Sequence, residues 1–163
     1  MIRKMTVEDA ARVAEIHVFS WRESYKGIIS DDFLFNRMRV AKQQEYFENA
    51  MLKKAERSRV YDDGIVKGFL TIGKCRDEDK LNAFELWGIY IDPFFTRQGI
   101  GSQFMAHTLE AAKNCGFKEI CLWVLEDNQR AIEFYKKHGF VPDGAIKFLE
   151  ALNVNEIRMV RGI

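Results

Sequence analysis

The sequence predicts an α/β protein of the α+β kind, in which helices cover both faces of a mixed β-sheet. Runs rich in β-branched and aromatic residues come first and later alternate with amphipathic helical runs, which favours a sheet with parallel and antiparallel strands. The chain has 163 residues, 47% hydrophobic and 30% charged, as expected for one globular domain with a sizeable core. We therefore expect a single domain spanning residues 1–163.

Turn and capping residues separate the elements predicted in the first half of the chain. Thr6 and Asp9 form a capping-box-like start for the first helix, with Asp where Glu is usual. Asp63-Gly64 is typical of a hairpin turn, because both central residues there must tolerate positive φ angles. The expected elements are a strand at 1–5, helices at 6 to about 21, 31–38 and 40–54, and strands at 57–62 and 65–74.

The second half predicts strands that alternate with helices. A strand ends at Asp92, because Pro93 cannot continue a sheet ladder, and a long helix ends before Gly116. Asn128 is placed to cap another helix, which Gly139 ends. The expected elements are strands at 83–92 and 119–126, helices after the glycine loop and at 128–139, and a terminal hairpin at 140–149 and 154–160.

The loop from Pro93 to Ser102, Pro-Phe-Phe-Thr-Arg-Gln-Gly-Ile-Gly-Ser, joins a strand to a helix through closely spaced glycines. The first N–H groups of a helix lack partners within it and attract anions, and glycines at positions 99 and 101 let a phosphate approach the backbone. Arg97 would add a charge-assisted hydrogen bond. A tight turn without a ligand fits the same glycines equally well. Phe104 stands where a dinucleotide fingerprint needs a small residue, and no P-loop is present.

Two blocks of sequence, found together and in order, resemble the GNAT superfamily of acetyl-CoA-dependent N-acetyltransferases. The first reads Glu85-Leu86-Trp87-Gly88-Ile89-Tyr90-Ile91-Asp92-Pro93 and runs into Arg97-Gln98-Gly99-Ile100-Gly101-Ser102. The second comprises Asn128, Ala131, Phe134-Tyr135 and Gly139-Phe140. The resemblance is strong from about 83 to 140. It implies a mostly antiparallel sheet of about seven strands, with the fourth and fifth splayed around the cofactor.

The resemblance also implies which residues bind acetyl-CoA, the cosubstrate. Backbone groups of Ile89 and Ile91 would hold the pantetheine amides, and Asn128 would contact the pantetheine arm besides capping its helix. The pyrophosphate would lie on Arg97, Gln98, Gly99, Ile100, Gly101 and Ser102. The family's loop usually has Gln or Arg where this chain has Thr96, which weakens one side-chain contact of a site made mostly of backbone groups.

Two residues are candidates for the chemistry. The resemblance implies that Tyr135 lies near the thioester sulfur, where it contacts the cofactor and acts as the acid. Its spacing alone is better explained by a half-buried aromatic residue on the apolar stripe of a helix. Glu85 is the candidate base, acting through water, by analogy with family members that carry Glu at this position. An exposed strand residue is the equal alternative for Glu85.

The segment after the first helix would form the wall of the acceptor site, as in the resembled family. Trp21 and Tyr25 offer aromatic faces to a cationic amine, and Arg22 offers a charge to a carboxylate. Trp21 and Tyr25 fit equally well as core residues. His17, His107 and His138 are isolated on predicted helices, and we expect them to be surface or packing residues.

Composition argues against several other classes of protein. A net charge of +1 gives no overall attraction to nucleic acid or membranes, and the cluster Lys53-Lys54, Arg57 and Arg59 is expected to be a solvated face. Three cysteines without paired spacing indicate reduced thiols and no metal site. With no apolar run of membrane-spanning length and no signal core, we expect a cytoplasmic location. Similar enzymes are often dimers, so a homodimer is compatible with the resemblance.

The leading hypothesis is direct transfer of an acetyl group from acetyl-CoA to a primary amine. A small-molecule amine or polyamine is preferred as acceptor, because the sequence has no extended peptide-binding feature. The alternatives are acetylation of a protein N-terminus or lysine, and a CoA-binding module without chemistry.

Overall fold

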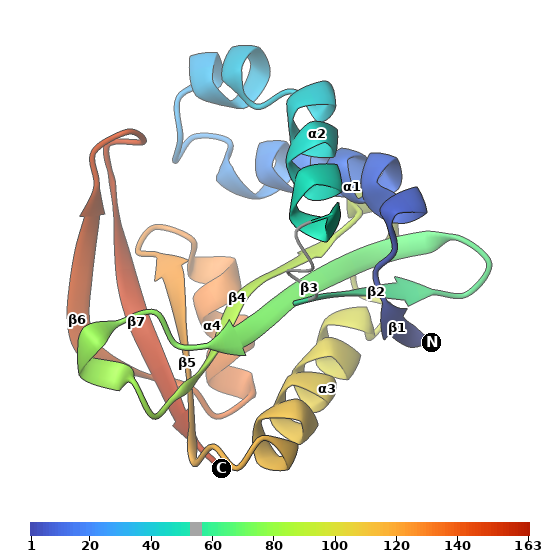
Figure 1. The fold of residues 1–163 in the computed structure, drawn as a ribbon. Helices are drawn as coiled ribbons and strands as arrows, with labels where there is room; N and C mark the ends of the chain where they lie inside the picture. The colour runs from blue at the N-terminus through green and yellow to red at the C-terminus, as the bar shows by residue number, and fades with distance from the viewer. Residues whose placement is uncertain (53–56) are drawn as a thin grey trace. The chain divides into compact units, whose positions relative to one another are not determined.

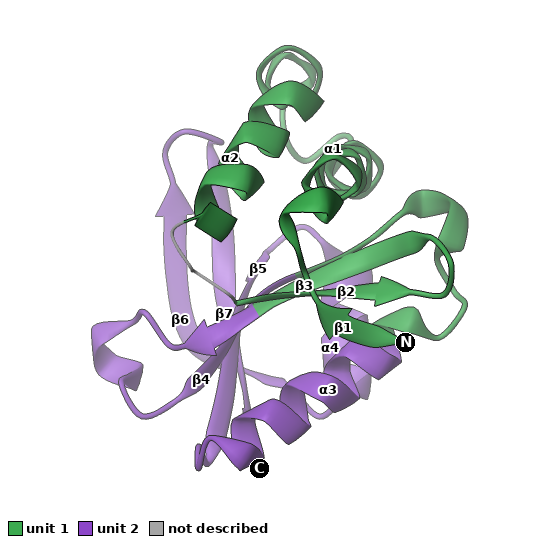
Figure 2. Cartoon of the chain, turned by 45° about the vertical axis from the view of Figure 1, so that its right-hand side comes forward, with its two compact units in different colours: residues 1–71, 89–101 green, residues 72–88, 102–163 purple. Residues whose placement is uncertain are grey.

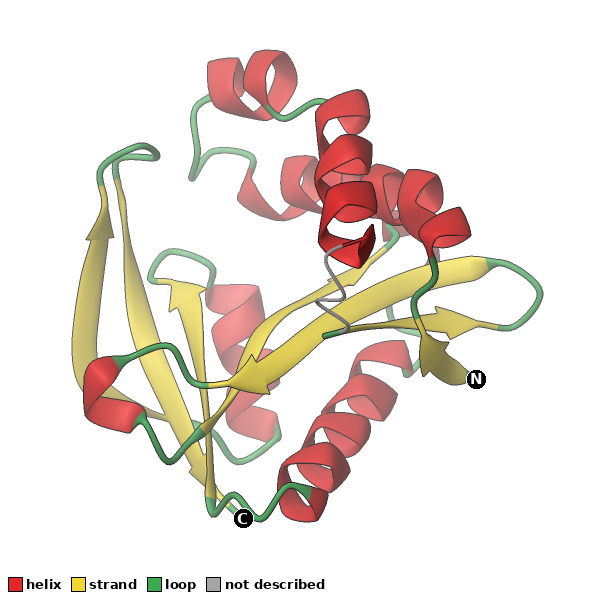
Figure 3. Cartoon of the chain, in the orientation of Figure 1, coloured by secondary structure: helices red, strands yellow, loops and turns green. Residues whose placement is uncertain are grey.

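The computed structural model describes residues 1–52 and 57–163. Its helices and strands follow one another as Figures 1 and 3 show. The helices are α1 (Ala10–Tyr25), α2 (Val40–Leu52), α3 (Ile100–Asn114) and α4 (Gln129–Lys137). The strands are β1 (Ile2–Lys4), β2 (Ser58–Asp62), β3 (Val66–Lys74), β4 (Phe84–Ile91), β5 (Glu119–Leu125), β6 (Val141–Leu149) and β7 (Val154–Gly162).

Within the described residues, seven strands form one mixed sheet in the order β1-β2-β3-β4-β5-β7-β6. Strand β4 runs parallel to β5, whereas β1–β2, β2–β3, β5–β7 and β6–β7 are antiparallel pairs. The β4–β5 register runs only from Phe84↔Ile120 to Leu86↔Leu122, although both strands continue beyond it. The expected mixed sheet with splayed fourth and fifth strands is therefore confirmed.

The chain forms two compact units, coloured separately in Figure 2. Unit 1 comprises Met1–Thr71 and Ile89–Gly101. Its core lies where the apolar stripes of α1 and α2 pack on β2 and β3, because buried side chains recur at helical spacing along α1. The buried residues of this cluster are Met5, Ala10, Val13, Ala14, Ile16, Phe47, Val60, Val66 and Phe69.

Unit 2 comprises Ile72–Gly88 and Ser102–Ile163. One face of its strands carries buried apolar residues, namely Phe84, Leu86, Ile120, Leu122, Val124 and Met159. The other face carries Glu85, Cys121 and Trp123, because successive side chains of a strand alternate between faces. On that second face, the Cys121 thiol donates a 3.0 Å hydrogen bond to the sulfur of Cys75, and both cysteines are buried.

Most elements lie within two residues of their expected bounds. The capping box of Thr6 and Asp9 is present, but a 3₁₀ turn (Val7–Asp9) precedes α1, which continues four residues past Trp21 to Tyr25. The helix expected at 31–38 is a π-helical segment, Asp32–Arg37. The end of the helix expected at 40–54 and the lysines at 53 and 54 lie outside the described residues.

Candidate active site

The glycine loop forms the helix entrance that the sequence predicts. Gly99 has a φ angle of +81°, and α3 begins at the next residue, Ile100. Among the described residues, no N–H group from Arg97 to Gly101 donates a turn, loop or cap hydrogen bond to a backbone carbonyl. Apart from Gly99 itself and its two chain neighbours, no heavy atom of the described residues lies within 4 Å of the position that a Cβ on Gly99 would occupy. The loop therefore offers several N–H donors and open space above its glycine, which suits an anion.

Arg97 holds an uncommon backbone conformation within this loop. Its φ angle is +62°, in the left-handed region that costs a residue with a Cβ about 1–2 kcal/mol. Strain of this kind is concentrated where a chain binds ligands, because the surrounding structure must maintain it. The Arg97 side chain is exposed.

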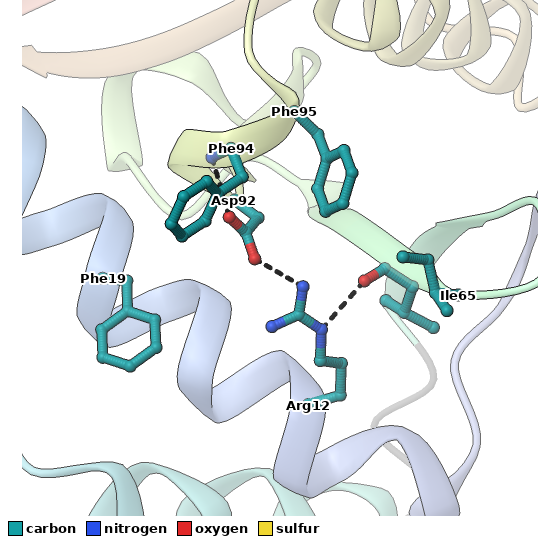
Figure 4. A pocket seen from close by; sticks show the side chains of 7 residues that line it. Arg12, Phe19, Ile65, Asp92, Phe94 and Phe95 are labelled. Atoms are coloured by element: carbon teal, nitrogen blue, oxygen red, sulfur yellow. Dashed lines mark hydrogen bonds and ion pairs between the residues drawn. The ribbon is translucent and has the colours of Figure 1, made fainter.

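Asp92 ties the start of the loop to α1. Its Oδ1 accepts a 2.9 Å hydrogen bond from the Phe94 N–H, and its Oδ2 accepts a 2.5 Å hydrogen bond from Arg12 Nη2. Arg12 Nε also donates to the Val66 carbonyl at 3.0 Å (Figure 4). These contacts fix the direction in which the chain leaves β4.

A largely apolar pocket of about 550 Å³ opens beside this ion pair in unit 1 (Figure 4). It is lined by Arg12, Phe19, Ile65, Val66, Asp92, Phe94 and Phe95. None of the site residues predicted from the sequence lines it.

The residues predicted for the acceptor site take different positions in unit 1. Trp21 and Tyr25 are brought together, with ring centroids 5.0 Å apart, and the Trp21 ring also stacks on Phe33 at 6.1 Å. The buried Trp21 indole N–H has no hydrogen-bond partner among the described residues. Arg22 instead donates to the carbonyls of Leu34 and Met38, at 3.0 and 3.3 Å, so its guanidinium secures the segment between α1 and α2.

His17 lies one helical turn before Trp21, inside an aromatic cluster. Its ring centroid is 4.6 Å from that of Tyr90, the β4 residue between Ile89 and Ile91. Its Nδ1 lies 3.0 Å from Gln43 Oε1, which only an N–H on Nδ1 can satisfy. Burial lowers the pKa of His17 to about 4, so the ring is neutral at pH 7 and serves as a packing residue, as expected.

In unit 2, Glu85 forms an ion pair with Arg76, a residue of the charged loop that follows β3. The Arg76 backbone N–H and Nε each donate to Glu85 Oε2 at 3.0 Å, and Nη2 donates to Oε1 at 2.5 Å. The Arg76 guanidinium also covers the Trp87 ring, 4.3 Å from its centroid. Glu85 is 1% exposed, so the alternative of an exposed strand residue is wrong. Both of its carboxylate oxygens are occupied by Arg76.

The second sequence block forms α4 as predicted. Asn128 caps the helix, because its side chain accepts a 3.2 Å hydrogen bond from the Ala131 N–H. Tyr135 is half-buried on α4, with its ring 6.0 Å from that of Phe140. Ser102 Oγ lies 3.4 Å from His138 Nε2. The helix is therefore positioned by its cap and by Phe140.

Arg158 anchors the loop that carries Arg76, a role that no sequence motif predicts. Arg158 is 5% exposed and donates to Asp77 at 3.0 Å, to Asp143 at 2.8 Å and to both Asp79 oxygens at 2.7 and 2.6 Å. Asp77 also accepts a 2.8 Å hydrogen bond from the Trp123 indole. These partners are up to 81 residues apart in the chain, so no local motif could have identified them.

Comparison with known proteins identifies the class to which this fold and loop belong. Residues 10–140 match the Acetyltransferase (GNAT) family, and the chain therefore belongs to that family and is an acyltransferase. An uncharacterised N-acetyltransferase of Bacillus subtilis, YuaI, is 31% identical over 138 residues, which cover 85% of this chain and 78% of the relative. Spermidine N(1)-acetyltransferase of Thermoplasma acidophilum is 27% identical over 139 residues, covering 85% and 86%.

Solved structures agree with this assignment at the level of the fold. The PaiA N-acetyltransferase of Thermoplasma acidophilum, solved in complex with coenzyme A, has a TM-score of 0.78 and 23% identity, covering 100% of this chain and 98% of that one. A ribosomal-protein-alanine N-acetyltransferase of Brucella melitensis has a TM-score of 0.74 and 18% identity, covering 100% and 99%. The N–H donors and open space at Gly99 fit the pyrophosphate of CoA. No helix among the described residues is both long and apolar enough to cross a membrane.

Proposed function

We propose that this chain moves the acetyl group of acetyl-CoA to a primary amine, by direct attack of the amine on the thioester. The observation that carries the proposal is the row of N–H donors from Arg97 to Gly101, with open space above Gly99. Ser102 and Asn128 complete the proposed cofactor contacts, and Ile89 and Ile91 would hold the pantetheine through their backbone groups. When bound, acetyl-CoA supplies an activated acyl group on a good leaving thiol.

An amine must lose a proton before it attacks, because a lysine-like amine has a pKa near ~10.4 and is protonated at pH 7. We place the base on the face of unit 2 that carries Glu85. Glu85 itself accepts this proton only after Arg76 releases it, because Arg76 occupies both oxygens.

The leaving thiolate needs less help, since a thiol has a pKa of roughly 8.5. Tyr135 is proposed as the acid that protonates it, from its place on α4. General-acid catalysis contributes about 10²-fold or more, and the contribution shrinks when the leaving group is already stable at pH 7.

The acceptor is proposed to be a small amine or polyamine that contacts Trp21 and Tyr25. Their adjacent rings offer the aromatic faces that attract an ammonium group. The relative from Thermoplasma acidophilum, which is named for spermidine, supports the same class of acceptor. Arg22 is assigned to holding the segment that follows α1, rather than to the acceptor.

We further propose that both units act as one N-acetyltransferase domain spanning residues 1–163, and that the enzyme works in the cytoplasm. Free thiols at Cys75, Cys115 and Cys121 suit a reducing compartment.

Two measurements test the proposed function. Acetyl-CoA should raise the melting temperature, because ligand at 100 times its Kd stabilises the folded state by about 2.7 kcal/mol. Release of CoA should then be measured with spermidine, other small amines, aminoglycosides and peptides. No thermal shift at millimolar acetyl-CoA would refute the cofactor site, and release with peptides alone would move the acceptor to proteins.

A further inference from the structure

Glu156 on β7 is a half-buried carboxylate with no hydrogen bond or ion pair in the described part of the chain. Its register partners are Leu125 on β5 and Lys147 on β6. The Lys147 ammonium points elsewhere: it lies 4.0 Å from the centroid of the Trp123 ring and 3.7 Å from Asp77 Oδ1. A partly buried carboxylate in this state needs a donor, because burying a polar group without one is costly.

Glu156 lies on the same face of unit 2 as Glu85. Glu85 pairs with Cys121, and Leu125, four residues further along β5, pairs with Glu156, so the strand alternation places all four side chains on one face. The pairing of β4 with β5 stops at Leu122, before β5 reaches Leu125. Glu156 therefore lies on the strand next to β5, roughly 5 Å away, beside the part of β5 that does not pair with β4.

We infer that Glu156 binds the ammonium group of the acceptor and takes the proton that must leave before acetyl transfer. This inference rests on the proposed function. Glu85, held by Arg76, then fixes the charged loop after β3, and Glu156 needs no ion pair to open before it accepts a proton.

The step balances with the groups named. The proton moves from the ammonium nitrogen to a Glu156 oxygen, which leaves a neutral amine and a carboxylic acid. The nitrogen lone pair forms the C–N bond to the acyl carbon, and the C–S bond breaks with its electron pair on sulfur. The second N–H proton is lost to water, Tyr135 protonates the sulfur, and Tyr135 and Glu156 exchange protons with solvent.

The charges around Glu156 agree with this role. Burial raises its pKa above the ordinary value, Lys147 and Arg76 lower it, and Glu85 raises it, with a net upward shift. The neighbouring β5 presents the apolar Leu125. A carboxylate with a raised pKa is a better base near neutral pH than an ordinary one.

The test compares Glu156→Gln with the wild type over pH 6–10, with CoA release from acetyl-CoA measured in the presence of spermidine. We expect kcat to fall about 100-fold at pH 7 with the KM for acetyl-CoA unchanged. The deficit should shrink toward pH 10, where the amine loses its proton to solvent, and Glu156→Asp should restore part of the rate. Glu150→Gln, an exposed site on the turn before β7, is the matched control and should keep the wild-type profile.

A second readout does not depend on turnover. In a carboxyl ¹³C NMR titration of the CoA-bound protein, spermidine should shift the Glu156 resonance and lower its pKa. A Glu156→Gln variant with the wild-type pH profile, or a Glu156 resonance that ignores spermidine, overturns the inference. If the wild type releases CoA with no amine, the proposed function fails separately, and the NMR titration still decides whether Glu156 binds an ammonium.

Discussion

Arg12 on α1 and Asp92 at the end of β4 form a hydrogen-bonded ion pair that sets where the glycine loop begins. Asp92 is 3% exposed, and its other oxygen accepts the Phe94 N–H. The pair thus couples a helix near the N-terminus to a loop 80 residues further along the chain.

Arg12→Met should therefore cost about 2 kcal/mol of unfolding free energy, because it leaves a buried carboxylate with one N–H donor. The affinity for acetyl-CoA should fall with it as the loop shifts. Arg37→Met is the control, since its partner Asp32 has a side chain 59% exposed and such pairs contribute less than about 1 kcal/mol. Urea unfolding and calorimetry measure both effects, and equal losses in the two variants would refute the coupling.

Gly99→Val should weaken acetyl-CoA binding at least tenfold, because its side chain would occupy the space that we propose for the pyrophosphate. The positive φ angle adds about 1–2 kcal/mol of strain without any ligand. Gly144→Val separates the two effects, since Gly144 has a φ angle of +93° and the same open surroundings on β6. Both variants should lose similar stability; a normal Kd for Gly99→Val would disprove the loop assignment.

Much of the fold could be predicted because its signals are local. Element boundaries are indicated within a few residues by Asp63-Gly64, Asp92-Pro93 and the Asn128 cap, and the structure confirms those boundaries. The extension of α1 to Tyr25 was missed although nothing between Trp21 and Tyr25 favours a stop and the next breaker is Gly27. The π-helical segment has no sequence pattern that separates it from an ordinary helix.

The site was predicted less completely, because its electrostatics depend on contacts distant in sequence. The Arg97–Ser102 loop could be identified from its glycines. The ion pair between Arg76 and Glu85 could not be predicted, because the two residues meet only when β4 is paired in the sheet. Arg22 looked available in sequence, yet the carbonyls it binds belong to Leu34 and Met38, 12 and 16 residues away.

Tyr135→Phe should lower kcat about tenfold while the Kd for acetyl-CoA stays within twofold, because the variant keeps the ring and removes only the hydroxyl. The effect is modest because a thiolate leaves readily near neutral pH. Tyr46→Phe, on an exposed position of α2, should leave turnover unchanged. Steady-state assays and calorimetry are the measurements; an unchanged kcat for Tyr135→Phe would remove this residue as the acid.

His17 should make stability fall on acidification. Its pKa is about 4 in the folded protein and about 6.5 when unfolded, so below pH 6.5 the unfolded chain takes up the proton first. Above pH 6.5, His17 causes no loss of stability. As the pH falls from 6.5 to 4, protonation of His17 in the unfolded chain lowers the free energy of unfolding, by about 3 kcal/mol in total. By pH 5, the wild type should lose about 2 kcal/mol more than His17→Phe.

Urea unfolding at pH 7 and pH 5 measures this difference. If His17→Phe shows the same loss as the wild type, a group other than His17 accounts for the acid sensitivity.

The mutual burial of Cys75 and Cys121 makes the chain chemically selective toward thiol reagents. Burial raises the pKa of Cys121 and suppresses its thiolate, whereas Cys115, just past the end of α3, is exposed. A maleimide should therefore label the native protein once, at Cys115. The other two thiols should react only when the sheet opens, so the rate of their modification reports the rate of unfolding.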